Sequence, residues 1–417
     1  MGISCYIIAD TFFIAQGLGA GGLTALNLAI PVFNFLFGCG LMFGIGGATK
    51  FSISKSMGHS EEGNVIYSNT IILTVLCSLI FLFTGLFGAE RLAVLLGADE
   101  EVLEMTATYL RWILIFAPAF MINEVLQCFV RNDENPNLVT IAMLAGSFAN
   151  IFMDYVFIFM MKLGILGAVL ATGFSPTVSV LVMLPHWIKK KNTFRWVKTN
   201  IAVKLIKQIV SLGFPSLLAQ VSGGIVMIIF NILILNMKGN VGVAAYGVIA
   251  NIAIVVTALY TGLAQGMQPL ISSYYGAGEK QHIKKVMKYG QVTMTVLSLA
   301  LYGGLYIFAP QITSAFNSEG NKQLQTIAET GLKLYFGSNL FVGYNTVIAT
   351  FFTSVERAMP AHILSLLRGL VLIIPLAFAM SALWGINGIW LSFPLAEAVV
   401  ACFGVCVNRK IKRELFT

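Results

Sequence analysis

The chain has 417 residues, of which 57% are apolar and only 11% are charged, and its mean hydropathy is +0.84. Soluble globular domains carry about 25% charged residues, so this composition excludes an ordinary soluble protein and indicates an integral membrane protein. The net charge of +8 raises the possibility of nucleic-acid binding, but the placement of the basic residues, described below, explains it by membrane topology.

Long apolar segments run through the whole chain, separated by short polar or Gly/Pro-rich breaks. A membrane helix needs about 20 apolar residues to cross about 30 Å of hydrocarbon, whereas the strands of a membrane barrel form short alternating segments. The sequence therefore predicts an all-α polytopic membrane protein with twelve transmembrane helices. The predicted spans cover residues 2–17, 22–49, 64–88, 104–130, 138–161, 164–188, 209–237, 241–274, 287–310, 325–353, 361–382 and 386–408.

The first predicted span, residues 2–17, is short and contains an acidic residue. As a helix it covers about 25 Å with no basic flank before it, so we expect either a start further upstream or a trimmed chain. It lacks the cleavage site of a signal peptide. Asp10 lies within it, in GISCYIIADTFFIAQ, where an unpaired charge in lipid costs several kcal/mol. The GLGAGG that follows matches a dinucleotide-binding pattern, but it joins two membrane spans, so we interpret it as a turn.

A second embedded acid, Asp154, lies in the fifth span in NIFMDYVFIFMM. Asn150 lies one turn before it on the same helix face, and Thr172 lies in the sixth span. Counted from the predicted external turns, Asp10, Asp154 and Thr172 all lie about 12 Å below the outer surface. We expect these four side chains to bind a hard cation such as Na⁺ through oxygen atoms, or to hold an exchangeable proton. The alternative is that each acid is a structural hydrogen-bond acceptor.

Other polar residues within the spans are candidates for a substrate cleft. Glu124 is a third embedded acid, and Arg131 lies seven residues later on the same helix face, so an internal ion pair is an alternative to substrate contact. The second half of the chain offers uncharged polar residues and no clear mid-span acid before Glu397. The candidate cleft residues are Glu124, Gln220, Tyr260 and Gln265.

The two halves of the chain resemble each other. GIGGATKFSISKSMGHSE (44–61) aligns with GLAQGMQPLISSYYGAGE (262–279) at an offset of 218 residues, and LGILGA in the first half is matched by WGINGI in the second. Because six spans are repeated six spans later, the halves are expected to be parallel repeats that can rock against each other to give alternating access. We expect a six-helix lobe at 1–188 with a shortened first helix, a basic cytoplasmic linker at 189–208 and a second six-helix lobe at 209–417.

Basic residues are concentrated on one side of the predicted membrane. With the twelve spans, one set of loops holds twenty of the 26 Lys and Arg residues and the opposite set holds six. The positive-inside rule places the first set, and both termini, in the cytoplasm. The four histidines lie near this cytoplasmic boundary, and we expect them to be solvated or to face lipid headgroups: His59, His186, His282 and His362.

Several classes of protein are excluded by missing motifs. The chain has no GxxxxGK[ST], no HExxH and no nucleophile elbow, so we expect no enzyme activity and no ATP hydrolysis, and the energy for transport must come from an ion gradient or a partner. The six cysteines lie in apolar spans without CxxC spacing and are expected to be packing residues: Cys5, Cys39, Cys77, Cys128, Cys402 and Cys406.

The motifs IADTFFIAQGLG, VRNDENPNLVTIAM and NIFMDYVFIF followed by LGILGAVLAT resemble the multidrug and toxic compound extrusion (MATE) family, most closely its MepA-like bacterial branch, and the resemblance runs the whole length. It implies the two-lobed MATE-like fold. It also implies an antiporter that exports diverse, often cationic, organic compounds in exchange for inward Na⁺ or H⁺. We expect a multi-pass monomer in the bacterial plasma (inner) membrane, with no cofactor besides the coupling ion and no nucleic-acid partner.

By this resemblance, the cation site of the first lobe falls on Asp10, Asn150, Asp154 and Thr172. The sequence departs from the family pattern at three places. Gln220 and Ser222 stand where some relatives carry an acid, Glu124 stands where a neutral amide is expected, and Pro176 is expected to interrupt a helix that usually continues.

Two other functions remain open on sequence grounds. A flippase for lipid-linked precursors is the first, because the same broad fold serves that task. Flippases of anionic pyrophosphate lipids should carry Arg or Lys in the cleft, whereas the mid-membrane charges here are acidic. A channel or receptor is the second, and the duplicated halves are evidence against a seven-helix receptor.

Overall fold

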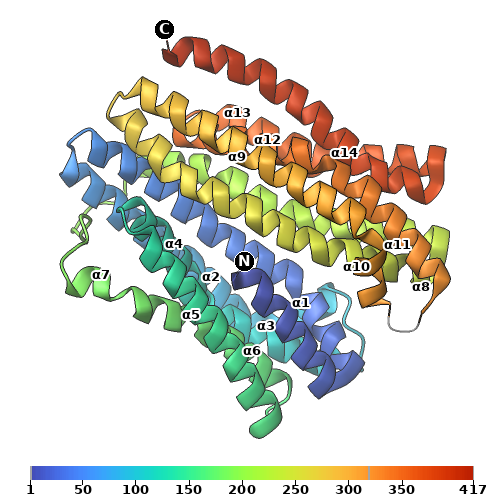
Figure 1. Ribbon diagram of the computed structural model, residues 1–417. Coiled ribbons are helices and arrows are strands. Elements are labelled where there is room, and N and C mark those ends of the chain that lie inside the picture. Colours follow the sequence, from blue (N-terminus) through green and yellow to red (C-terminus); the bar gives the residue numbers. More distant parts are fainter. Residues whose placement is uncertain (1, 318–319, 417) are drawn as a thin grey trace. The chain divides into compact units, whose positions relative to one another are not determined.

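The computed structural model describes residues 2–317 and 320–416, with only the backbone described for residues 2–9, 20 and 416, so the Cys5 side chain lies outside the described part. Within these residues the chain forms helices and no strands, which confirms the predicted all-α class (Figure 1). The elements are α1 (Gly2–Ser56), α2 (Ser60–Leu95), α3 (Leu103–Ile115), α4 (Ala117–Asn132), α5 (Pro136–Asp154), the π-helix η1 (Tyr155–Met160), α6 (Ile165–Met183), α7 (Pro185–Ile188), α8 (Val203–Gly276), α9 (Lys280–Ile307), α10 (Ala309–Phe316), α11 (Lys322–Tyr335), the 3-10 helix η2 (Phe336–Ser338), α12 (Asn339–Ser354), α13 (Ala358–Leu366), the π-helix η3 (Leu367–Val371) and α14 (Ile373–Phe416).

Three helical stretches contain an internal break. α1 is interrupted at Gly19, α8 at Gly239 and α14 at Trp384 and Gly385. The three glycines have φ values of 65°, 61° and 57°, a conformation that residues with a Cβ rarely adopt. With each long stretch counted once, length and hydropathy identify seven candidate membrane spans among the described residues, or up to eight when α3 and α4, bent by 47°, count as one span.

α6 is continuous through its proline. It runs from Ile165 to Met183 and includes Pro176, so the expectation that Pro176 interrupts the sixth span is wrong. A proline inside a helix removes one backbone hydrogen bond, and here the carbonyl that loses its usual donor four residues later is that of Thr172. The helix therefore tolerates the proline next to a candidate site residue.

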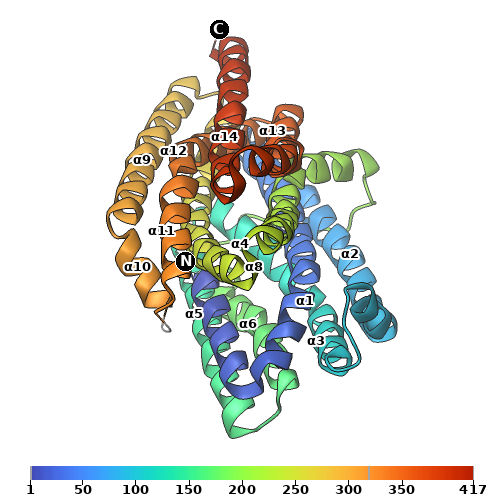
Figure 2. The same cartoon turned by 90° about the vertical axis from the view of Figure 1, so that its right-hand side faces the viewer.

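The chain divides into two compact units, Met1–Val221 and Ser222–Thr417. In the first unit α1 packs against α4, α2 against α3 and α5 against α6, and Figures 1 and 2 both show α5 and α6 side by side. In the second unit α12 packs against α9 and α14. Each unit has its own apolar core, with Phe129 fully buried in the first and Phe351 and Trp390 fully buried in the second.

α1 and the start of α8 approach most closely at two glycines of the first unit. A Cβ added at Gly46 would clash with the backbone of Ile209, and one added at Gly213 would clash with the backbone of Met42. The two helix backbones are therefore in direct contact, and any larger residue at these positions would push them apart.

A buried aspartate holds the segment after α7 against the first unit. The Asp133 carboxylate contacts Nε2 of His186 at 2.9 Å, Nζ of Lys55 at 3.0 Å and the backbone N of Thr193 at 2.8 Å. His186 is only 1% exposed, so the expectation of a solvated His186 is wrong, because Asp133 supplies a buried partner. His59 and His282, with side chains 63% and 51% exposed, are solvated as expected.

Residues 191–202 have no regular secondary structure, yet α2 binds their backbone. The N–H groups of Arg195, Val197 and Ala202 donate to polar side chains of α2, which belong to Asn64, Ser68 and Asn69. Phe194 is fully buried among aromatic rings of the first unit. We call residues 191–202 the docked segment, because it is bound along its length.

Candidate functional site

Asp10 on α1 and Asp154 at the end of α5 are both buried, at 5% and 0% exposed. Oδ1 of Asp10 and both carboxylate oxygens of Asp154 are buried without a hydrogen-bond partner among the described residues. The charge of Asp10 is close enough to act on the Asp154 carboxyl group. An unsatisfied buried acceptor costs about 1–3 kcal/mol and a charged one more, so this pair favours the binding of a cation or a proton.

α5 and α6 position the other two predicted residues. Asn150 lies one turn before Asp154, and its Nδ2 donates to Oγ1 of Thr172 at 3.4 Å. Oδ1 of Asn150 is buried without a partner in the described structure. The structure thus brings Asn150, Asp154 and Thr172 together on two neighbouring helices, with their oxygen atoms available as ligands.

Aromatic packing holds the first part of α1 beside the end of α5. The rings of Phe13 and Phe159 meet edge to face with centroids 5.9 Å apart, and Gly17 lies against the side chain of Ile158. Both partners of α1 belong to the π-helix η1, which directly follows Asp154, and π-helical turns are frequent at functional sites. These contacts place the helix of Asp10 next to Asp154.

The four residues offer only oxygen ligands. Two carboxylates, an amide oxygen and a hydroxyl suit a hard cation, and two carboxylates alone also suit a shared proton. In the described part of the chain, no three His, Cys, Asp or Glu side chains cluster as a metal site would require. The donor set is therefore of the kind that binds an exchangeable alkali cation or proton.

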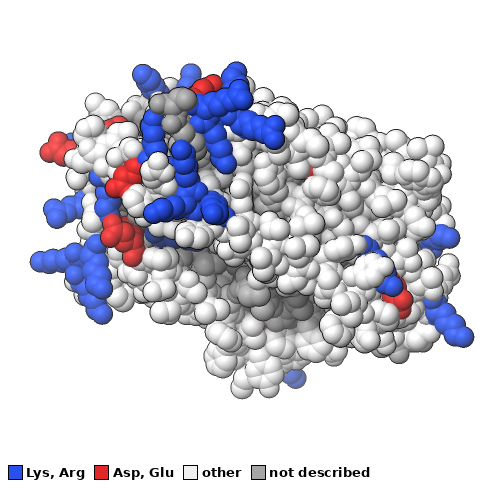
Figure 3. Space-filling view, turned by 45° about the horizontal axis from the view of Figure 1, so that its top comes forward, with Lys and Arg blue, Asp and Glu red and all other residues white. Residues whose placement is uncertain are grey.

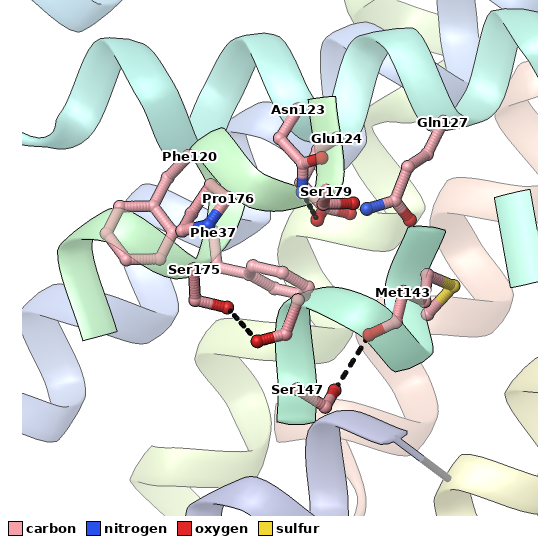
Figure 4. Close-up of a pocket in the computed structure, with 11 residues that line it drawn as sticks. Phe37, Phe120, Asn123, Glu124, Gln127, Met143, Ser147, Ser175, Pro176 and Ser179 are labelled. Carbon is pink, nitrogen blue, oxygen red and sulfur yellow. Dashed lines mark hydrogen bonds between the residues drawn. The ribbon is translucent and has the colours of Figure 1, made fainter. Parts of the chain in front are cut away.

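Glu124 lies in a separate small cavity of the first unit, shown in Figure 4. It is 6% exposed, and Nδ2 of Asn123 approaches its Oε1 at 3.5 Å. Oδ1 of Asn123 and Oγ of Ser179 are buried without partners among the described residues. The cavity is lined from α1, α4, α5 and α6 by Phe37, Phe120, Asn123, Glu124, Gln127, Met143, Gly146, Ser147, Ser175, Pro176 and Ser179.

The size of this cavity limits what it can hold. Its volume is about 40 Å³. A water molecule occupies about 30 Å³ in the liquid, whereas drug-sized ligands need about 300–1,000 Å³. In this conformation the cavity accommodates a water molecule or a small ion, and an organic substrate would require the surrounding helices to separate. The ion pair between Glu124 and Arg131 is not formed in the described structure, although the charge of Arg131 still acts on Glu124.

The other predicted cleft residues lie elsewhere. Gln220 is half-buried on α8, where its Cβ lies near Gly38 of α1. Tyr260 is only 1% exposed in the core of the second unit, where its hydroxyl donates to Oγ of Ser298 at 2.9 Å. Gln265, also in the second unit, is half-buried. None of the three lines the cavity around Glu124.

Sequence reasoning missed the polar neighbours of Glu124. Asn123, Glu124 and Gln127 are three polar residues within two turns of a largely apolar helix, which was a usable signal. Ser179 comes from another helix, so only the packing of α4 against α6 shows that it belongs to the same cavity.

The MatE family model matches residues 1–156 and 215–379. The multidrug export protein MepA of Staphylococcus saprophyticus is 27% identical over 414 residues, which cover 98% of this chain and 90% of that protein. The protein of the same name from Staphylococcus aureus is 26% identical over 415 residues, with the same coverage of both chains.

Solved structures share the fold. An outward-facing multidrug resistance MATE family transporter of the MOP superfamily superposes with a TM-score of 0.93 at 22% identity, covering 99% of this chain and 93% of that one. A MOP superfamily transporter from Pyrococcus furiosus, for which reverse polarity of the binding pocket suggests a different function, superposes with a TM-score of 0.91 at 22% identity, covering 100% and 93%.

Proposed function

Because the chain belongs to the MATE family, whose members are membrane transporters and not enzymes, we propose that it is a secondary active multidrug exporter of the bacterial plasma membrane. It would move organic, often cationic, compounds out of the cytoplasm against inward Na⁺ or H⁺. The observation that supports this most directly is the pair of buried acids, Asp10 and Asp154, with three unpartnered oxygen atoms between them.

We assign the ion coupling to Asp10, Asn150, Asp154 and Thr172. A bound Na⁺ would be coordinated by the unpartnered oxygens of the first three and by the hydroxyl of Thr172. A proton would instead be shared by the two carboxylates, which cannot both be charged at close range without a large cost. In either case, binding removes the charge repulsion and the unsatisfied acceptors, so the ion changes the relative energy of the conformations it visits.

The mechanism requires alternating access, and the backbone supports a repeated architecture. We propose twelve crossings, in which the breaks at Gly19, Gly239 and Gly385 divide the long stretches α1, α8 and α14. The crossings would form two six-helix lobes, 1–188 and 209–417, joined by a cytoplasmic linker at 189–208, with both termini in the cytoplasm and the protein acting as a monomer.

Left-handed backbone positions recur at a nearly constant interval, which supports the repeat. Gly19 and Gly239 are 220 residues apart, as are Gly58 and Gly278. Three further pairs, Gly97 and Gly320, Glu134 and Glu356, and Gly164 and Gly385, are separated by 223, 222 and 221 residues. The interval of 220 near Gly58 differs from the offset of 218 predicted from sequence, because the sequence alignment paired Gly58 with Gly276, the last residue of α8.

We propose that the substrate contacts Glu124, Gln220, Tyr260 and Gln265 during the cycle. Glu124 would attract the positive charge of an organic cation once the small cavity around it opens. Tyr260 is buried in the present conformation, so its contribution would require exposure of the second unit's core during transport.

The test is efflux of ethidium from proteoliposomes under an imposed Na⁺ or H⁺ gradient. We expect flux with one gradient in the wild type, loss of gradient-driven flux in Asp154→Asn, and near-normal flux in Gln220→Ala. Size-exclusion profiles of the variants show whether they fold. Equal flux in Asp154→Asn and wild type would overturn the ion-coupling assignment. Absence of flux from folded wild type under both gradients would instead favour the flippase alternative, and flux down a substrate gradient without countertransport would favour a channel.

A further inference from the structure

A second cavity lies at a basic end of the second unit, away from every residue assigned above. Its volume is about 220 Å³, and it is lined by Lys284, Met287, Lys288 and Gln291 of α9 and by Lys412 near the end of α14. Met287 is buried, at 1% exposed, while the lysines and the glutamine reach solvent. Two helices far apart in the sequence thus direct three ammonium groups to one cavity.

The charge around this cavity is strongly positive. The first turns of α9 and the last turns of α14 together carry Lys280, Lys284, Lys285, Lys288, Arg409, Lys410, Lys412 and Arg413. The nearby acids already have partners: Glu279 contacts His282 at 2.8 Å and Glu414 contacts Arg357 at 3.1 Å. Within the described residues no carboxylate pairs with Lys288 or Lys412. Clustered basic side chains, in blue, are visible in Figure 3 against a mostly uncharged surface.

An apolar helix face begins directly next to the lysines. Tyr289, Val292, Val296 and Leu299 are 69%, 53%, 61% and 53% exposed. Their spacing of three, four and three residues puts them on one face of α9. In a membrane protein such a face contacts acyl chains. A molecule bound at the lysines can therefore place an anionic group in the cavity and hydrocarbon along this face.

We propose that this cavity binds the phosphate-bearing headgroup of an anionic membrane lipid, with its acyl chains lying along the apolar face of α9. Ammonium groups of Lys284, Lys288 and Lys412 would donate to phosphate oxygens, and the Gln291 amide would bind a headgroup hydroxyl or ester. Inorganic phosphate shares the anionic chemistry but cannot use the apolar face. The lipid site is independent of the transport function proposed above.

The test is titration of the purified full-length protein with dioctanoyl-phosphatidylglycerol, dioctanoyl-phosphatidylcholine and inorganic phosphate, followed by native mass spectrometry and by the thermal unfolding midpoint. Each surface lysine contributes about a fivefold factor to binding of an anionic lipid. We expect K288Q/K412Q to bind phosphatidylglycerol about 30-fold more weakly than wild type. The matched control K285Q/K410Q removes the same charge from the same two helices outside the cavity and should weaken binding less than about threefold.

Three results would overturn the proposal. Equal loss in the two double variants would show that surface charge alone attracts the lipid. Equal binding of phosphatidylcholine would show that the anionic headgroup is not recognised, and inorganic phosphate binding as tightly as phosphatidylglycerol would make this a free-anion site. Because Lys288 is exposed, the single variant K288Q replaces the double variant if the latter does not fold, with an expected fivefold loss against K285Q.

Discussion

Replacing Asp133 with asparagine should release the docked segment from the first unit. The Asp133 side chain is fully buried, and its oxygens contact Lys55, His186 and Thr193. Asparagine keeps the volume but removes the charge and places an NH₂ group where an acceptor is needed. Breaking a buried ion pair costs about 3–5 kcal/mol, and since the Lys55 side chain is 26% exposed and can rehydrate, we expect the lower end, about 3 kcal/mol.

Glu134→Gln is the matched control for this change. Glu134 follows Asp133 and pairs with the same Lys55 nitrogen at 3.2 Å, but its side chain is 86% exposed. Exposed ion pairs contribute about 0–1 kcal/mol because water and salt screen them. The two neighbouring acids therefore differ in burial, and the difference between their variants isolates the effect of the buried charge.

The assay is the rate of trypsin cleavage after Arg195 and Lys198 within the docked segment. The N–H groups of Arg195 and Val197 are bound to α2, so cleavage requires the segment to open. When opening is fast relative to cleavage, the rate follows the open population, and about 3 kcal/mol corresponds to about 150-fold faster cleavage. Equal rates in Asp133→Asn and Glu134→Gln would refute the reasoning, because the buried charge would then not hold the segment.

Three further perturbations test other contacts. Burial favours the neutral form of Asp133, but hydrogen bonds from its three partners outweigh this and hold its pKa below the ordinary 3.8, so the stabilisation is present above that value and is lost as the pH falls through the lower folded-state pKa; hydrogen exchange of the docked segment should accelerate below about pH 4 in wild type, and less in Asp133→Asn. Gly213→Ala should lower the thermal unfolding midpoint by forcing α8 away from the Met42 backbone, at a cost of about 1–3 kcal/mol, and an unchanged midpoint would contradict that close contact. Arg368→Gln should leave Glu397 buried without its partner at 3.1 Å and cost about 3 kcal/mol in the same measurement, whereas adding Glu397→Gln should restore part of the loss.

The candidate coupling residues were accessible from sequence because their signal is local. A charge inside an apolar run is costly wherever the run packs, so Asp10 and Asp154 were identified without knowledge of any contact. Helical periodicity then placed Asn150 on the face of Asp154. The all-helical class followed in the same way, since apolar runs of sufficient length in a membrane can satisfy their backbone groups only as helices or barrels.

Features that depend on distant contacts were not accessible. His186 was expected at a solvated boundary, but its partner Asp133 lies 53 residues earlier and only the fold brings the two together. The repeat register was misjudged by two residues for a related reason: Gly276 ends a helix and Gly278 provides a left-handed turn, and the letter for glycine does not distinguish these roles. Pro176 was expected to break α6, but the packed helix tolerates it.

The buried acids of the two units differ in their partners, and this difference bears on where coupling occurs. Glu397 in the second unit accepts from Nδ2 of Asn345 at 2.7 Å and pairs with Arg368 at 3.1 Å, so its charge is compensated within the protein. Asp10 and Asp154 in the first unit lack such partners among the described residues. A compensated carboxylate gains little from binding a cation, whereas an uncompensated pair gains the full attraction. We therefore expect ion exchange in the first unit and a structural role for the ion pair in the second.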